Sequence, residues 1–464
     1  MTRRYRPRLT ALVKAVTVLM VVLFFADWFG LNPYRSFFSN YERMEGFISF
    51  AHLYLYFLMM VSVFRTRRDW LVLFHVSIVA SIAVSYIALL QRLGLRASPQ
   101  GGFRVDSTIG NPTYLAAYLL FHVWLFALLM KQFWPRSGEI KKWVLEIAYA
   151  FVLFFELAII YFTATRGVVL ALLITAVPFF ALVVLYWNRM FSNDLSTSFP
   201  FKGMSNAPQG QSNGKVNHSA ESSEMRWSFG RKLAGLVLAL VIVVPLVFWL
   251  NRNTDFIQKS PVLKRITNYS LTETTITSRF LIWKMSWKGA LERPLLGWGQ
   301  ENYYLVFQKF YDPGLYGQEP WFDRSHNIVF DWLIHAGFVG LAAYLAVFGA
   351  AFWMIMQGIR KRTFALWEGS VLAALFISYF FQNIFVFDNL NTYLLFFAFL
   401  AYTQYLALEH MKGADVALPA KYEAKTGHRQ SADPDLLFGR GLAAAVVLLA
   451  VSAITIYVWN LTPM

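Results

Sequence analysis

The chain has 464 residues, of which 57% are hydrophobic and only 15% are charged, with a net charge of +16 and no cysteine. Soluble globular proteins carry about 25% charged residues, so this composition excludes an ordinary soluble domain. The absence of cysteine excludes disulfides and thiolate chemistry. The basic residues lie between apolar runs and form no nucleic-acid-binding motif, which excludes DNA and RNA as partners.

Apolar runs of about 20 residues recur along the chain, and an α-helix of this length crosses about 30 Å of hydrocarbon. The sequence therefore predicts an all-α, polytopic helical membrane protein with about 11–12 transmembrane helices in a single transmembrane domain over residues 1–464. The basic N-terminus precedes an apolar run without a small-residue cleavage site, which predicts an uncleaved first helix. The predicted spans are about 11–30, 45–64, 70–91, 112–131, 143–162, 167–187, 232–250, 328–357, 366–385, 390–408 and 440–459.

Three segments between the predicted spans are long. Residues 188–231 and 409–438 are polar and rich in Ser, Gly, Asn and Lys, so we expect flexible loops there. Residues 251–327 contain many aromatic side chains, which predicts one long loop of short helices that lie on the membrane. The chain stops soon after the last predicted span, which fits either a natural end or a longer protein with an external domain.

Lysine and arginine are distributed unevenly between alternate loops. They concentrate before the first span, at 65–68, at 131–142, at 360–362 and in the two polar loops. Positive charge marks the cytoplasmic side of a membrane protein, so we expect these segments, with the N-terminus, in the cytoplasm. The loop 251–327 then lies outside, and an odd number of spans also places the C-terminus outside.

Unusual polar groups collect at the predicted outer ends of the helices. They are Arg104 to Asn111, Thr163 to Arg166, Arg279, His326 with Asn327, and Asp388 with Asn389. A transporter would instead place charged residues near the bilayer centre, where Glu156 is the best example. The distribution favours chemistry at one membrane face, with transport as the alternative that Glu156 keeps open.

Two arginines at these ends each have a structural and a functional interpretation. Arg166 joins two apolar spans at 163–167, where burying its charge without a partner is costly. It either extends to the membrane interface or clamps an anionic head group, for which the forked guanidinium donors are suited. Phe280, Trp283 and Trp287 fall on one helical face beside Arg279, which by itself favours an amphipathic interfacial helix.

His326 lies in the tripeptide Ser-His-Asn at the predicted outer start of a span. A lone histidine is more often structural than catalytic. At this helix end, however, a neutral imidazole can accept a proton from an attacking hydroxyl, and nearby arginines disfavour its charged form. Asn111 and Pro112 open another span as cap and first-turn residue, which structure alone explains.

In combination, these motifs resemble the O-antigen ligase/polymerase superfamily, in the same order over about residues 100–408. The motifs are G-N-P-x-Y-L-A-A-Y-L-L at 110–120, T-A-T-R-G at 163–167, R-x-x-x-W at 279–283 with P-L-L-G-W-G at 294–299, and S-H-N at 325–327 with G-x-x-G at 337–340. The resemblance implies a glycosyltransferase-C-like fold in the bacterial cytoplasmic (inner) membrane. It also implies an inverting, metal-independent transferase without a cofactor. Such an enzyme moves a glycan from undecaprenyl pyrophosphate to an acceptor hydroxyl, on lipid A–core or another surface acceptor, at the periplasmic face. The family has about twelve spans, against the eleven predicted here.

The resemblance also implies roles for individual residues. Arg166 and Arg279 match the arginines that hold the donor pyrophosphate, and His326 matches the histidine that activates the acceptor hydroxyl. We expect substrate-binding contributions from Arg104, Asn111, Asn327, Trp283, Tyr303 and Asp388, and no metal site.

The sequence leaves three alternatives open. A repeat-unit polymerase or a protein O-glycosyl ligase would use the same chemistry on another acceptor. Peptidoglycan polymerases of the cell-shape and division type have a similar span count but rely on an outer-loop carboxylate, for which Asp388 or Asp312 would serve. A transporter or flippase for lipid-linked sugars would need internal repeats and polar helices through the midplane.

Overall fold

A computed structural model describes residues 6–41, 43–133, 140–191, 218–268, 274–317 and 321–409 of the chain. This part of the chain is built from helices and contains no strand, which confirms the predicted all-α class. The predicted span 440–459 and the predicted loop 409–438 lie outside the described residues, apart from the last residue of the final helix.

The helices follow the predicted spans closely. Those of the first half are α1 (Ala11–Trp28), α2 (Pro33–Phe38), α3 (Phe47–Val63), α4 (Arg67–Arg92), α5 (Pro112–Phe133), α6 (Ile140–Thr163), α7 (Arg166–Leu185) and α8 (Trp187–Phe191). Those of the second half are α9 (His218–Leu250), α10 (Asp255–Lys259), α11 (Pro261–Thr267), α12 (Thr274–Glu292), α13 (Tyr303–Lys309), the 3₁₀ turn η3 (Pro313–Leu315), α14 (Ile328–Arg360), α15 (Leu366–Asn383) and α16 (Leu390–Glu409). Each predicted span from 11–30 to 390–408 coincides with one of these helices.

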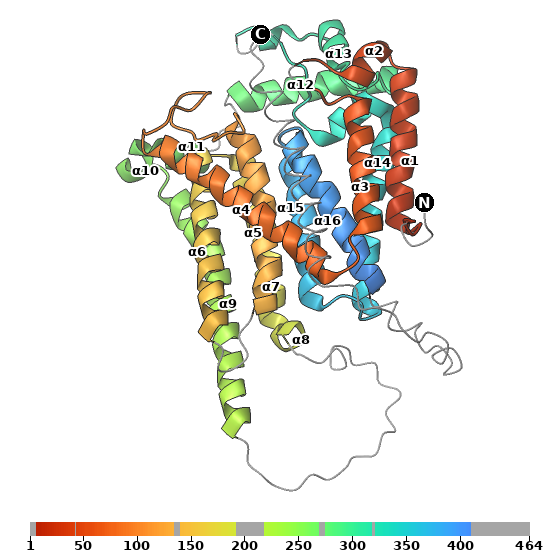
Figure 1. Cartoon of the computed structure of the whole chain (residues 1–464). Coiled ribbons are helices and arrows are strands. Elements are labelled where there is room, and N and C mark those ends of the chain that lie inside the picture. Colours follow the sequence, from red (N-terminus) through yellow and green to blue (C-terminus); the bar gives the residue numbers. More distant parts are fainter. Residues whose placement is uncertain are drawn as a thin grey trace, which may run out of the picture.

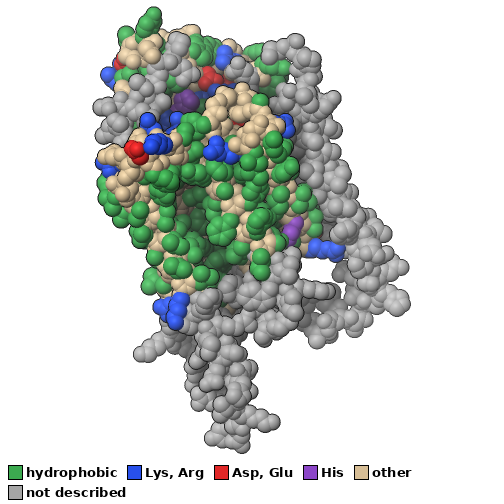
Figure 2. Space-filling model, turned by 90° about the vertical axis from the view of Figure 1, so that its left-hand side faces the viewer, with side chains coloured by type: hydrophobic (Ala, Val, Ile, Leu, Met, Phe, Trp, Pro, Cys, Tyr) green, Lys and Arg blue, Asp and Glu red, His purple; other side chains and the backbone are tan. Residues whose placement is uncertain are grey.

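Six helices of the described chain are long and apolar enough to cross a membrane, by length and composition. They are α1, α4, most of α5, α7, the Gly230–Leu250 part of α9, and α14, while α3 and the Ile147–Thr163 part of α6 are shorter apolar helices. The outward side chains of α9, such as Leu236, Leu240 and Val243, are about half exposed, as expected of a surface that faces lipid. Figure 2 shows hydrophobic side chains over the middle of one face and charged side chains gathered mainly at its upper end. The chain is thus a multi-pass membrane protein.

The spans pack side by side, α1 along α14, α5 along α6, and α7 along both α15 and α9. The predicted surface segment 251–327 contains α10, α11, α12, α13 and η3, and α12 lies across one end of the bundle (Figure 1). A separate hydrophobic core beneath α12 includes Ile282, Tyr303, Phe307 and Leu333. The aromatic residues of this segment therefore build a small folded layer, which closes one end of the bundle.

A break in α14 joins this layer to the spans. Ala336 and Gly337 have non-helical backbone angles, so Ile328–His335 forms a short helix of its own before the spanning part begins. The loop 294–299 docks onto the break, where the backbone N–H of Trp298 donates to Ile334 O (2.7 Å) and that of Phe338 donates to Pro294 O (2.7 Å). The span predicted over 328–357 is present as α14, with a break near its start where Gly337 adopts a positive φ of 65°.

Helices occupy both ends of the loop predicted over 188–231, and its residues 192–217 lie outside the described part of the chain. The helix α8 occupies its start, and α9 begins at His218 rather than near residue 232. The polar composition of this segment does not prevent the apolar helix α9 from beginning within it.

Candidate active site

Several motif segments meet at the end of the bundle that α12 covers. The helices α5, α7 and α14 all begin there, although their first residues are far apart in sequence (Figure 1). The residues that sequence analysis placed at the outer ends of the helices are therefore brought to the same end of the molecule.

The tripeptide Ser325-His326-Asn327 is held by its two outer residues. The Asn327 side chain caps α14 by accepting hydrogen bonds from the backbone N–H groups of Val329 (2.9 Å) and Phe330 (3.4 Å). The Ser325 hydroxyl and backbone N–H both donate to Asp331 Oδ1, at 2.7 and 2.9 Å. Ser325 and Asn327 thus fix the backbone on both sides of the histidine.

His326 itself adopts a left-handed backbone conformation, with φ of 53°. This conformation is uncommon for a residue with a side chain, and it persists only where the surroundings fix it. The Trp283 indole N–H donates to Ser325 O (3.2 Å), so α12 also helps to hold the tripeptide. The imidazole lies between the rings of Phe322 and Phe387, with centroids 5.6 and 5.0 Å away.

The surroundings of His326 favour its neutral form. Burial lowers the pKa of the imidazole to about 4, and the positive charge of Arg279 acts in the same direction. Arg43 and Arg324 add to this effect, while Asp323 opposes it. Arg279, from α12, is thus close enough to His326 for its charge to be felt, as the sequence analysis expected.

Arg166 begins α7 and binds the C-terminal end of α11. Its Nε and Nη2 donate to the backbone oxygens of Arg265 (2.5 Å) and Asn268 (3.0 Å). Arg265 donates in return from its Nε to Ala164 O (3.3 Å). The loop of short helices is thereby tied to the turn between α6 and α7 through two guanidinium groups.

Arg104 reaches the same turn from the loop between α4 and α5. Its Nε donates to Thr163 O (2.7 Å) and its Nη2 to Thr165 Oγ1 (3.2 Å). Burial lowers the pKa of Arg104 to about 10, and the charge of Arg265 contributes. Three guanidinium groups, from Arg104, Arg166 and Arg265, therefore surround the turn 163–166, which is a suitable environment for an anion.

The segment between α15 and α16 connects this arginine cluster to His326. A Cβ atom on Gly167 would lie 3.6 Å from Phe385 Cβ. Two residues further on, the Phe387 ring contacts His326 and also lies 5.8 Å from the ring of Tyr114. The start of α7 and the histidine are thus neighbours of the same short segment.

Three ion pairs in the residues directly before the histidine were missed by sequence reasoning. Arg43, from the loop between α2 and α3, donates from Nε and Nη2 to both oxygens of Asp323 (2.5 and 2.9 Å). Arg324 donates to Glu45 Oε2 (2.8 Å) and to Glu301. The available signal was the Asp-Arg pair directly before Ser-His-Asn, whereas nothing in the sequence around Arg43 indicates a partner.

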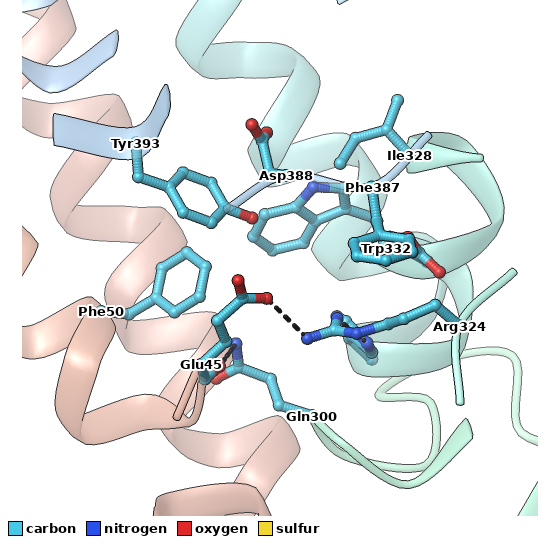
Figure 3. A pocket seen from close by; sticks show the side chains of 11 residues that line it. Glu45, Phe50, Gln300, Arg324, Ile328, Trp332, Phe387, Asp388 and Tyr393 are labelled. Carbon is cyan, nitrogen blue, oxygen red and sulfur yellow. Dashed lines mark hydrogen bonds and ion pairs between the residues drawn. The ribbon is translucent and has the colours of Figure 1, made fainter. Parts of the chain in front are cut away.

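A small cavity lies beside the Arg324–Glu45 pair (Figure 3). Its lining includes Glu45, Gln300, Trp332 and Asp388, and Phe387 separates it from His326 by touching both. Charged and aromatic side chains both line this cavity, and it shares Phe387 with the surroundings of the histidine.

The remaining predicted residues face the protein interior. Asn111 accepts a hydrogen bond from the Thr113 backbone N–H (2.8 Å) at the start of α5. Tyr303 is fully buried, with its hydroxyl 3.1 Å from Ser286 Oγ, so its ring has no exposed surface for a sugar. Asp388 accepts hydrogen bonds from three neighbouring side chains, and burial raises its pKa to about 6. Of these three residues, Asp388 lines the small cavity.

The structure also shows where Asp312 and Glu156 lie, the residues considered for the peptidoglycan polymerase and transporter alternatives. Asp312 accepts a hydrogen bond from the Gly314 backbone N–H (3.0 Å) at the start of η3. Glu156 is buried in α6 and accepts a hydrogen bond from Ser81 Oγ (2.5 Å). Across the described part of the chain, no group of three His, Asp or Glu side chains is arranged to hold a metal ion.

Comparison with known proteins gives one family. The model of a family described as O-antigen ligase matches residues 149–345. This match extends from α6 into α14 and includes Arg166, Arg279 and His326. No curated protein matches the chain.

Proposed function

We propose that this multi-pass membrane protein, which carries an O-antigen ligase family domain over residues 149–345, transfers a glycan from undecaprenyl pyrophosphate to an acceptor hydroxyl. The domain belongs to a glycosyltransferase-type enzyme family. The single observation that carries the proposal is a half-buried histidine that lies between two aromatic rings, has its pKa lowered by burial and by Arg279, and contacts a segment that also borders the arginine cluster at the start of α7.

In the proposed mechanism, the acceptor hydroxyl of lipid A–core or another surface glycan attacks the anomeric carbon of the donor. A new carbon–oxygen bond forms while the bond to the phosphate oxygen breaks, and the pyrophosphate leaves with the electron pair. His326 accepts the hydroxyl proton, which its neutral form permits. Attack from the side opposite the leaving group inverts the anomeric carbon.

Arg166 and Arg279 are proposed to stabilise the leaving pyrophosphate. Guanidinium groups bind phosphate oxygens through forked donors, and here Arg166 stands with Arg104 and Arg265. Positive charge that is already in place where negative charge develops lowers the barrier without reorganisation. The protein's own cations would thus supply the electrostatic stabilisation.

We propose that this centre faces the periplasm. The charges that sequence analysis assigned to the cytoplasm, at 65–68 and 360–362, lie at the helix ends remote from α12 (Figure 1). Arg67 at the start of α4 is 3.9 Å from Glu368 at the start of α15, so the two loops share one end of the bundle. This separation agrees with the rule that positive loops stay inside.

The test is replacement of the three proposed residues in a strain that lacks the native protein. Arg166→Ala, Arg279→Ala and His326→Ala are expected to abolish surface glycan at normal protein levels. Arg96→Ala and His52→Ala, at exposed positions, are matched controls that should leave glycan unchanged. Wild-type glycan in all three site variants would contradict the proposal, and supplying different acceptors separates a ligase from a polymerase.

A further inference from the structure

Two ion pairs of opposite order connect the loop 39–46 to the residues before His326. Arg43 pairs with Asp323, and Glu45 pairs with Arg324. In the loop, the positive Arg43 precedes the negative Glu45 by two residues. In the other segment, the negative Asp323 directly precedes the positive Arg324. A shift along either segment would bring like charges together, so this pattern accepts one register only.

The loop that carries Arg43 and Glu45 is itself firmly anchored. The hydroxyl of Ser36, in α2, donates to Gln300 O (2.9 Å) and accepts from Asn302 Nδ2 (2.9 Å). A Cβ atom on Gly46 would lie 2.5 Å from Phe37 O, so the loop lies directly against α2. The first three helices therefore provide a fixed support, although they lie outside the family match.

Arg43 also contacts the other neighbour of the histidine. Its guanidinium carbon is 4.3 Å from the centre of the Phe387 ring, and its Nη1 donates to the Tyr114 hydroxyl (3.3 Å). The Phe387 ring is in turn 5.0 Å from His326. Arg43 thus contacts two neighbours of the histidine, namely Asp323, which lies in the same segment as His326, and Phe387.

We infer that the first outer loop belongs to the catalytic centre, and that Arg43 and Glu45 are positioning residues that clamp the Asp323–Arg324 segment and so hold His326 in place for proton transfer. The inference rests on the proposed function, since it assigns the clamp to the histidine that the function uses. It assigns a role to a part of the chain that the family match does not reach.

The clamp has one exchangeable pair and one fixed pair. The Arg43 and Asp323 side chains are 20% and 19% exposed, so water can reach a reversed charge at either position. Arg324 is 5% exposed and also binds Glu301 and His335, so reversing it would leave buried charges unpaired. The Arg43–Asp323 pair is therefore the one to test.

The first experiment is a charge exchange in the full-length protein, assayed for transfer in membranes with an undecaprenyl pyrophosphate-linked glycan. Arg43→Glu and Asp323→Arg should each lower the transfer rate on the order of 10²-fold, because displacement of a reacting group by about 1 Å has that effect. The combined exchange should recover the part of the activity that depends on the ion pair, although not the part that depends on the contacts of Arg43 with Phe387 and Tyr114, and Arg43→Lys should also recover part of it. Lys309→Glu with Glu292→Lys, an exposed pair away from the histidine, is the control that should change nothing.

The second experiment separates positioning from simple folding support. The charges that face His326 are Arg279 on α12, Arg43 on the clamp loop, and Asp323 and Arg324 on its own segment. Arg43→Gln removes a positive charge, which should raise the pKa of His326 and move the acid limb of the rate–pH profile to higher pH. Asp323→Asn removes a negative charge and should move the acid limb to lower pH. Both variants break the same ion pair, so shifts in opposite directions are not explained by loss of folding support.

The outcomes distinguish this inference from the proposed function. If His326→Ala is inactive while both single charge reversals act at the wild-type rate, the clamp is not required and the inference fails alone. It also fails if the exchange restores nothing although the protein is folded and abundant. If Arg166→Ala, Arg279→Ala and His326→Ala all keep the wild-type rate, the proposed function fails.

Discussion

Gly337 and Leu295 are in direct backbone contact, and a Cβ atom on the glycine would lie 2.3 Å from the Leu295 carbonyl oxygen. The backbone N–H groups of Phe338 and Val339 donate to Pro294 O (2.7 Å) and Leu295 O (3.4 Å). In the opposite direction, a Cβ atom on Gly297 would lie 2.5 Å from Ile334 O. The Pro-Leu-Leu-Gly-Trp-Gly and Gly-x-x-Gly motifs are thus the two halves of one backbone joint, which sets the direction of the short helix behind His326.

Replacing the glycine of this joint should destabilise the protein. Gly337→Ala introduces a side chain at φ of 65° and against a carbonyl oxygen, and backbone strain of this kind costs about 1–3 kcal/mol. We expect a lower melting temperature in detergent and reduced glycan transfer. Gly349→Ala is the control within α14, because its Cβ atom would meet nothing within 4 Å. Equal stability of the two variants would show that the joint is not under constraint.

The pH dependence of transfer should reflect the environment of His326. Burial and Arg279 lower the pKa of this imidazole to about 4, so it stays neutral and able to accept a proton well below the usual histidine range. Activity should therefore persist as the pH falls from 7 and decline only as it approaches the lowered pKa. Arg279→Gln should move the decline to higher pH, beside its effect on rate. A wild-type decline centred on the ordinary histidine pKa of about 6.5 would contradict this assignment.

The fork of the Arg166 side chain should matter as well as its charge. Arg166→Lys keeps the charge but not the two donors that reach Arg265 O and Asn268 O, so we expect a loss on the order of 10²-fold in the transfer rate. Asn268→Ala is the matched control, because its contact with Arg166 uses only the backbone oxygen. Full activity of Arg166→Lys would reduce the role of Arg166 to a general positive charge.

A variant at Glu156 distinguishes the glycan-transfer hypothesis from the transport hypothesis. Glu156 is buried and accepts a hydrogen bond from Ser81, which Gln at this position can also accept. Glu156→Gln should leave glycan transfer near the wild-type rate, since the residue lies in α6 away from the proposed centre. A transporter that used this carboxylate would lose its activity, and loss of glycan in this variant at normal abundance would favour transport.

The parts of the site that sequence could predict are those with local signals. Arg166 and His326 stand at helix starts, and their flanking residues mark those starts, so the pattern also predicts which end of the bundle they occupy. The Arg43–Asp323 pair joins residues 280 positions apart, and nothing local to Arg43 indicates its partner. Long-range ion pairs of this kind depend on the packing of α1 against α14, which the apolar sequences of both helices leave undetermined.

The same limit explains Tyr303. The aromatic content of 251–327 predicted correctly that this segment folds, but not which rings face inward. Tyr303 lies at 0% exposure in the core beneath α12, whereas Phe280 and Trp287 are 55% and 45% exposed. An aromatic ring stabilises a core and binds a sugar through the same apolar face, so composition alone does not separate the two uses.

The central claim is that His326 accepts the acceptor's proton, and transfer by the purified protein tests it most directly. Wild-type protein, His326→Ala and the exposed control His52→Ala are supplied with one defined undecaprenyl pyrophosphate glycan and several acceptors, with EDTA present. The account predicts a product of inverted anomeric configuration from the wild type and the control, and a rate lower on the order of 10²-fold or more in His326→Ala. Equal rates for folded His326→Ala and wild type would contradict it.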